Sequence, residues 1–230
     1  MTADRHSGAS MPDSVDLGFN GLTARPGAHI CGIYAGERQR DEIVLPFLET
    51  GLRAGDKCMC IVDSIEPAQI LAKLDPDLDP RQRADVNQLV VMRSSHVFCR
   101  SGRFSANETI GFWKVALSDA MYDSRFEMVR AIDTWSQHDV VVDPDEHLLL
   151  ESEMNRVLPL YPQVALCLYD LEHFGGALIF NLLRTHPILL LGGLLLENPY
   201  YLSPDEVMAE TAQGSANLGV LQKAAFRAKP

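Results

Sequence analysis

The stretch His29-Ile-Cys-Gly-Ile-Tyr34, followed by Ala35-Gly-Glu-Arg-Gln-Arg-Asp41, decides the fold class of this chain. The first part has the apolar pattern of a buried β-strand, and the second part leads into a helix. A phosphate-binding loop at such a junction needs several glycines, whose N–H groups wrap the phosphate, together with a Lys and a Ser or Thr. This junction has one Gly, no Lys and no hydroxyl side chain. We therefore expect an α/β fold of the nucleotide-binding kind that does not hydrolyse nucleoside triphosphates.

The composition limits the classes of partner. The chain has 230 residues, of which 47% are hydrophobic and 22% charged, which is enough for one large core. Its net charge of −11 disfavours direct nucleic-acid binding, which depends on clustered Lys and Arg. The longest apolar run, residues 187–196, falls short of the roughly 20 residues that span a membrane, so we expect no membrane partner. The five cysteines are odd in number and form no C-x-x-C pair, which favours reduced thiols in a cytoplasm.

Apolar strand-like runs alternate with segments of helical periodicity along the chain. The expected strands are residues 29–34, 57–62, 88–92, 126–131 and 164–169, with a final pair, 187–191 and 194–197, turning at Gly192-Gly193. The expected helices are residues 41–54, 66–74, 105–122, 143–158 and 176–183, with a last helix opened by Ser203-Pro-Asp-Glu206. Strands that are apolar on both faces predict a mostly parallel sheet with helices on both faces and an antiparallel addition at one edge.

We expect one folded domain, because the chain shows neither an internal repeat nor a long linker. Residues 1–25 are rich in Ser, Asp, Gly and Ala and lack the apolar segment of a signal peptide, so they are predicted to be a flexible lead-in. The domain is predicted over residues 26–212. Residues 213–230 are predicted to be an Ala-rich tail.

Motifs spread over most of the chain resemble one family. They are PFLETGLRAGDKCMCIV at 46–62, Asp133-Thr-Trp135, LCLYD at 166–170, Leu183-Arg-Thr-His-Pro187 and Asn198-Pro-Tyr-Tyr201, the last two together being the most specific. From about residue 29 to 206 the chain resembles the methanogen/methylotroph DcmR sensory domain, abbreviated MEDS. The resemblance implies a RecA-like fold without a working phosphate loop, found alone or fused to transcription-factor and kinase modules. It also implies sensing of small hydrocarbon derivatives.

The chain departs from the family pattern in three places. Ser95-His96 stands where a Tyr is usual, Ile132-Asp133 replaces a Gly-Glu pair, and Leu150 precedes Glu151 where a Tyr-Glu pair is common. Each change alters the polarity or the size of a pocket. The resemblance therefore leaves the identity of the ligand open.

Polar and aromatic side chains near the ends of the expected strands form the candidate ligand site. In an open α/β sheet, ligands bind at the carboxyl ends of the strands. The alternative for any single one of these residues is that it caps a helix or bonds loop backbone. We expect an aromatic and acidic pocket made by Tyr34, Asp133, Trp135 and Tyr169. The full candidate set is His29, Cys31, Tyr34, Glu37, Asp133, Trp135, Tyr169 and His186.

A metal site made of His29, Cys31 and His186 can be considered, because the first two alternate on one face of a strand. Zinc sites in proteins, however, usually contain tight ligand pairs such as C-x-x-C or H-x-x-x-H. The chain has no such pair. We therefore expect no metal and no cofactor, and the alternative role for the two histidines is hydrogen bonding to backbone at strand ends.

We expect a non-catalytic, cytoplasmic sensory or regulatory module. A small organic ligand or a partner protein would bind the strand ends, and a separate kinase, sigma-factor regulator or transcription factor would receive the signal. The apolar terminal strands favour a homodimer. The alternative is a divergent RecA-like nucleotide-binding or hydrolytic enzyme, for which Cys167 with His186, or Asp133 with Glu151, supplies reactive groups without a diagnostic spacing.

Overall fold

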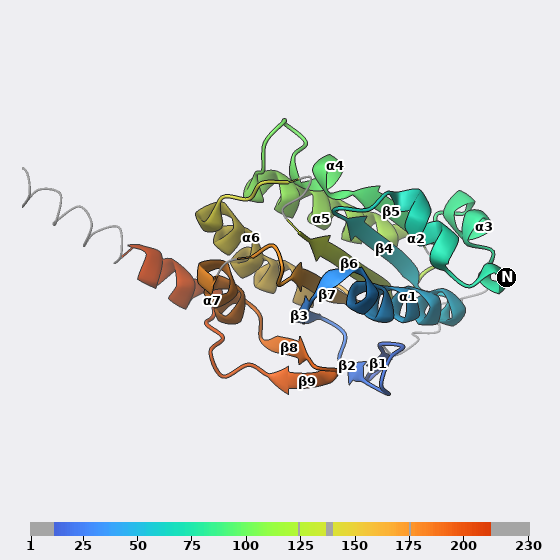
Figure 1. The fold of residues 1–230 in the computed structure, drawn as a ribbon, viewed down its shortest axis with the longest axis horizontal. Helices are drawn as coiled ribbons and strands as arrows, with labels where there is room; N and C mark the ends of the chain where they lie inside the picture. Colours follow the sequence, from blue (N-terminus) through green and yellow to red (C-terminus); the bar gives the residue numbers. More distant parts are fainter. Residues whose placement is uncertain (1–11, 124, 137–139, 175, 213–230) are drawn as a thin grey trace, which may run out of the picture.

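The computed structural model describes residues 12–212 except 124, 137–139 and 175, and its centre is a seven-stranded sheet (Figure 1). The strands are β3 Ala28–Tyr34, β4 Lys57–Val62, β5 Leu89–Arg93, β6 Val129–Trp135, β7 Gln163–Asp170, β8 Ile188–Leu191 and β9 Leu194–Glu197. Their order across the sheet is β5-β4-β6-β7-β3-β8-β9, and every pair is parallel except β8 with β9. This confirms the predicted α/β class with its antiparallel edge.

Seven labelled helices connect these strands within the described residues. They are α1 Gly36–Ala54, α2 Pro67–Lys73, α3 Pro80–Asp85, α4 Ser94–Phe98, α5 Ala106–Tyr122, α6 Pro144–Val157 and α7 Gly176–Thr185, and residues 204–212 are also helical. Ser105 and Asp143 accept hydrogen bonds from the first N–H groups of α5 and α6, as their capping sequences predict. Sequence periodicity missed α3 and α4, which are too short to show it.

The two faces of the sheet carry different helices. Leu48 of α1 and Ile70 of α2 belong to the core on one face. Leu117 of α5, Leu150 of α6 and Leu182 of α7 belong to the core on the other. Successive side chains of a strand point to opposite faces, so the strands in the middle of the sheet are buried on both. We call the second side the α6 face.

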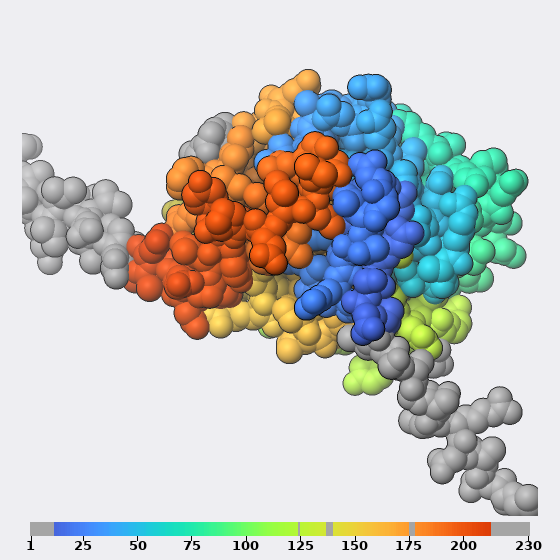
Figure 2. Space-filling model, turned by 90° about the horizontal axis from the view of Figure 1, so that it is seen from below, coloured from blue at the N-terminus to red at the C-terminus, as the bar shows by residue number. Residues whose placement is uncertain are grey.

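The N-terminal residues differ from the predicted flexible lead-in. The strands β1 Val15–Asp16 and β2 Thr23–Ala24 pair antiparallel, and Leu17 between them is fully buried. A Cβ added to Gly18 would lie 2.2 Å from the carbonyl oxygen of Pro46, so the hairpin packs directly against α1. Figure 2 shows this blue segment beside the orange strands β8 and β9, and Asn20 donates to the carbonyl oxygen of Gly193. The folded unit therefore begins before residue 26, whereas residues 1–11 and the predicted tail lie outside the described residues.

The edge pair turns where the sequence predicts it. Gly192 and Gly193 have φ values of 56° and 78°, in the left-handed region that a two-residue hairpin turn requires.

Within the described residues, none of the helices combines the length and the apolar character needed to cross a membrane.

Candidate functional site

The junction between β3 and α1 has no phosphate cradle. The N–H of Ala35 donates to the side-chain oxygen of Gln39 at 2.9 Å, and the N–H of Gly36 faces the Asp170 carboxylate at 3.5 Å. The backbone groups that would hold a phosphate are therefore bonded to side chains, one of which is anionic. This geometry agrees with the sequence argument against nucleoside triphosphate hydrolysis.

Glu37, one of the predicted ligand residues, lies on the surface in the first turn of α1. It contacts Arg40 at 3.2 Å and also pairs with Lys73. Asp41 pairs with the same two cations, so four charges form one network. The side chain of Glu37 thus serves a surface ion-pair network, apart from the other predicted residues.

Tyr34 is separated from His29 and Cys31 by the alternation of β3. It is buried in the core on the α1 face, whereas Cys31 belongs to the core on the α6 face. Burial raises the pKa of the Tyr34 hydroxyl, with a further contribution from the charge on Asp170. The predicted pocket that joined Tyr34 with residues of the opposite face is therefore not assembled.

Asp133, Trp135 and Tyr169 do lie together, but inside the strands and not at an open rim. The predicted strand 126–131 is β6 Val129–Trp135, so Asp133 and Trp135 are strand residues. All three side chains are buried. The indole N–H of Trp135 donates to Asp133 at 3.0 Å, and the ring stacks on Phe98 with centroids 4.2 Å apart.

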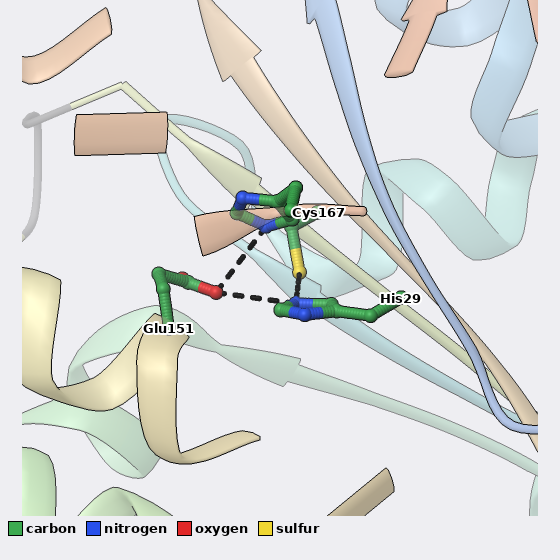
Figure 3. A group of neighbouring side chains, drawn as sticks. His29, Glu151 and Cys167 are labelled. Atoms are coloured by element: carbon green, nitrogen blue, oxygen red, sulfur yellow. Dashed lines mark hydrogen bonds and ion pairs between the residues drawn. The ribbon is translucent and has the colours of Figure 1, made fainter. Parts of the chain in front are cut away.

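The α6 face contains a buried polar cluster centred on Glu151, which we call the Glu151 cluster. Its members are His29 of β3, His147 and Glu151 of α6, Cys167 and Tyr169 of β7, and His186, which follows α7. Figure 3 shows His29, Glu151 and Cys167 pointing toward one another. Oε1 of Glu151 accepts from the Tyr169 hydroxyl at 2.7 Å and lies 3.4 Å from Nε2 of His147. Oε2 lies 3.2 Å from Nε2 of His29 and 3.3 Å from Nε2 of His186.

Outer hydrogen bonds orient the two imidazoles that face Oε2. The Asn155 amide nitrogen donates to the carbonyl oxygens of Glu151 at 2.9 Å and Thr185 at 2.6 Å. The Asn155 oxygen is thereby turned to Nδ1 of His29, 3.0 Å away. Nδ1 of His186 lies 3.0 Å from the carbonyl oxygen of Leu182. Since both partners are acceptors, each ring carries a proton on Nδ1 and directs Nε2 at Glu151.

Burial sets the protonation of the cluster. It lowers the pKa of His186, and it lowers that of His147 to about 4. Burial opposes ionisation of Glu151, but the surrounding imidazoles hold its pKa well below the usual value. Burial and the Glu151 charge raise the pKa of Asp133 to about 8, and burial raises that of the Cys167 thiol. One carboxylate therefore stays charged beside a neutral carboxyl group and a thiol.

A small cavity adjoins the Glu151 cluster. Its volume is about 20 Å³, and its lining includes His29, Trp113, Asp133, Glu151 and Cys167. A cavity of this size holds roughly one water-sized group. In the described conformation, an organic ligand of several atoms does not fit at this place.

The sequence contained a signal for this site that its motifs did not reveal. His147, Glu151 and Asn155 occur at positions i, i+4 and i+8 of α6, which places three polar side chains on one face of a helix. That face is the one that packs on the sheet. Cys167 lies directly beside Cys31 across β3 and β7, and it is Cys167 that joins the cluster.

The structure thus combines an α/β sheet, a β3–α1 junction whose N–H groups are bonded to side chains, and a buried polar cluster under α6. The family model described as MEthanogen/methylotroph, DcmR Sensory domain matches residues 28–187, and the chain belongs to this MEDS family. Its role is accordingly regulatory and sensory, not enzymatic, and its fold is an α/β fold with a mostly parallel seven-stranded sheet.

Two known proteins show how far the similarity extends. The transcriptional repressor DcmR of Methylorubrum extorquens is 25% identical over 195 residues, which cover 80% of this chain and 69% of the repressor. The crystal structure of the flagellar accessory protein FlaH from Methanocaldococcus jannaschii matches with a TM-score of 0.47 and 10% identity. That match covers 74% of this chain and 75% of FlaH.

Proposed function

We propose that this chain senses a chemical signal at the Glu151 cluster and passes it to a signalling partner that controls transcription. The observation that carries the proposal is the cluster itself. Burying a carboxylate with three imidazoles costs free energy, and an apolar core of the same shape would often be at least as stable. Such clusters mark functional sites, and the family to which the chain belongs is a sensory one.

The cluster is connected to elements at the surface. Glu151 and Asn155 lie on α6, and the latter bonds the end of α7 through the Thr185 carbonyl. Both helices are tied to residues 204–212 by ion pairs, Arg156 with Asp205 at 2.6 Å and Arg184 with Glu210. A change in charge or occupancy at Glu151 therefore acts on α6, α7 and the last described helix together.

The nature of the partner and of the signal is part of the proposal. The relative named as a transcriptional repressor supports a transcriptional output, through a transcription factor, a kinase or a sigma-factor regulator. All five cysteines are unpaired, which supports a cytoplasmic location. The cavity of about 20 Å³ favours a signal the size of a single atom or water over the organic ligand that the sequence predicts, which would require α6 to move away from the sheet.

Deletion and complementation in the native host test this function. The deletion strain is complemented with the wild type, with Glu151→Gln or with Glu153→Gln, and transcripts are compared. Both substitutions lie on α6 and remove one carboxylate, but the side chain of Glu153 is partly exposed and pairs with Arg156. We expect Glu151→Gln to leave the transcript pattern of the deletion strain, or to fix it in one state, and Glu153→Gln to restore the normal pattern. Normal complementation by a folded Glu151→Gln protein would refute the proposal.

A further inference from the structure

We propose that His29, Glu151, Cys167 and His186 bind one divalent transition-metal ion of the zinc type. This inference deepens the proposed function and rests on it only for the role of the ion as the signal. The four ligand atoms all lie within 4.8 Å of one another, and the four residues are buried. The four ligands come from separate parts of the chain, so the site needs none of the closely spaced ligand pairs that the sequence lacks.

Three of the six distances between the ligand atoms are those of a tetrahedral site. Metal–ligand bonds of about 2.0–2.3 Å place tetrahedral N, O and S atoms roughly 3.3–3.6 Å apart. Oε2 of Glu151 lies 3.2 Å from Nε2 of His29 and 3.3 Å from Nε2 of His186. Sγ of Cys167 lies 3.5 Å from Nε2 of His29. Three of the edges of a zinc tetrahedron are therefore already formed.

The two imidazoles are oriented as metal ligands are. Each directs its protonated Nδ1 outward, to the Asn155 oxygen or to the Leu182 carbonyl oxygen, and its Nε2 inward. Metal-bound histidines almost always donate their second ring N–H to such an acceptor. Nε2 of His186 is buried and makes no hydrogen bond within the described residues, although a carboxylate oxygen lies 3.3 Å away. When this ring is neutral, its Nε2 lone pair faces the carboxylate, which is unfavourable, and a cation between them removes the repulsion.

The charges balance when a divalent ion is present. Without it, the carboxylate of Glu151 faces either neutral rings, leaving a buried negative charge, or two adjacent imidazolium rings whose centroids lie 4.2 Å apart. Both arrangements are costly in a buried site. Binding of M²⁺ displaces the thiol proton of Cys167 to solvent, so that one thiolate, one carboxylate and two neutral imidazoles give a net charge of zero.

The ligand set also selects the class of ion. A thiolate and two imidazoles favour zinc, cobalt and iron over magnesium and calcium, which prefer oxygen ligands. The cavity of about 20 Å³, which is lined by three of the four residues, His29, Glu151 and Cys167, has room for one further small ligand on the ion. The site could thus respond to the ion or to a small molecule that binds it.

Cobalt titration of the full chain tests the inference. After treatment with a chelator, Co²⁺ should bind at one equivalent and produce tetrahedral ligand-field bands together with a thiolate-to-cobalt charge-transfer band in the near ultraviolet. Zn²⁺ should displace it, and Mg²⁺ should have no effect. The absence of tight one-to-one binding to the folded chain would overturn the inference.

Two cysteine variants give a matched comparison. Cys167→Ser should abolish the charge-transfer band and weaken Co²⁺ binding at least about 100-fold. Cys31→Ser, which changes the neighbouring thiol across β3 and β7, should keep the band. The reverse outcome would refute the assigned ligands. Should Cys167→Ser fail to fold by circular dichroism, Asn155→Ala replaces it, with an expected loss of about 10–100-fold in affinity because His29 is no longer oriented.

Different results refute the proposed metal site and the proposed function. Metal binding in vitro combined with normal complementation by Glu151→Gln would leave the site standing and refute its signalling role. An abnormal transcript pattern without one-to-one metal binding would refute the metal site and keep the proposed function.

Discussion

Arg130→Met is expected to destabilise the whole domain, because Arg130 joins three separate parts of the chain. It is the second residue of β6 and lies on the α1 face, with a side chain that is 2% exposed. Its Nε donates to the Asp56 carboxylate at 2.6 Å, and its Nη1 donates to the carbonyl oxygen of Asp16 in the N-terminal hairpin at 2.5 Å. The guanidinium also lies over the ring of Phe47, 5.4 Å from its centroid.

The magnitude follows from the burial of the ion pair. Removing one partner of a buried pair typically costs about 3–5 kcal/mol, because the other charge stays buried alone. The Asp56 side chain is 12% exposed, so water compensates part of the lost charge. Methionine also keeps much of the apolar contact of the arginine stem. We therefore expect a loss of about 2–4 kcal/mol in the free energy of unfolding, or roughly 5–15 °C in Tm for a domain of this size.

Urea denaturation followed by circular dichroism measures this loss. The matched control is Arg125→Met, which breaks a pair between Arg125 and Asp123 at the surface, where the arginine side chain is 55% exposed. We expect the control to change stability by less than about 0.5 kcal/mol. If Arg130→Met falls within about 0.5 kcal/mol of the wild type, the reasoning about this pair is wrong.

The pH dependence of the loss gives an independent check. Burial raises the pKa of Asp56, and Arg130 opposes that rise. Without Arg130 the pKa in the folded state moves further above the unfolded value, so in the window between them the folded state binds more protons. The free energy of unfolding of the variant then falls as the pH rises through that window. The loss relative to the wild type should be smaller at about pH 4.5 than at about pH 8, and an equal loss at both would contradict the mechanism.

Three further predictions concern packing, thiols and association. Gly51→Ala should lower the free energy of unfolding by about 1–3 kcal/mol in urea denaturation, because the added Cβ would lie 2.4 Å from Cδ of the buried Arg130 side chain. Gly111→Ala, in α5, has open space around the added Cβ. It should instead raise the free energy of unfolding by up to about 1 kcal/mol, because Ala favours the helix. In the folded chain a thiol reagent should modify Cys99 alone among the five cysteines, since the other four are buried and Cys99 is partly exposed. Rapid reaction of two or more thiols would be evidence against this packing. The predicted homodimer should use the edge strand β9, where Leu196 is 44% exposed. Light scattering should then find a dimer for the wild type and a monomer for Leu196→Lys. A monomeric wild type would exclude the homodimer.

Much of the fold could be predicted because its signals are local. The caps at Ser105 and Asp143 and the turn at Gly192-Gly193 depend on residues within a few positions of one another, and the structure confirms all three. The predicted strand 126–131 differs from the observed β6, which begins at Val129 and continues to Trp135. Asp133 is a polar residue in a buried strand, and periodicity cannot recognise a strand position whose burial cost is offset by partners that only the folded chain supplies.

The predicted ligand site was only partly assembled for the same reason. Trp135 and Tyr169 share the α6 face, as the predicted pocket requires. Tyr34, however, lies on the opposite face of the sheet, and Glu37 lies at the surface. A strand-end rule locates the edge of the sheet where side chains gather. It does not determine which face each side chain takes, since a shift of one residue reverses it.

By itself the sequence determined the α/β class, the order of the main elements and the absence of a phosphate loop between Tyr34 and Asp41, since each depends on composition or on neighbouring residues. Only the tertiary structure decided that His29 meets Cys167, 138 positions later, beneath Glu151 of a third element. It also decided that the N-terminal hairpin is held by Arg130, 114 positions from its partner Asp16. The physical reason is that sheet register and helix packing bring such residues together, and neither is encoded in any short stretch of the chain.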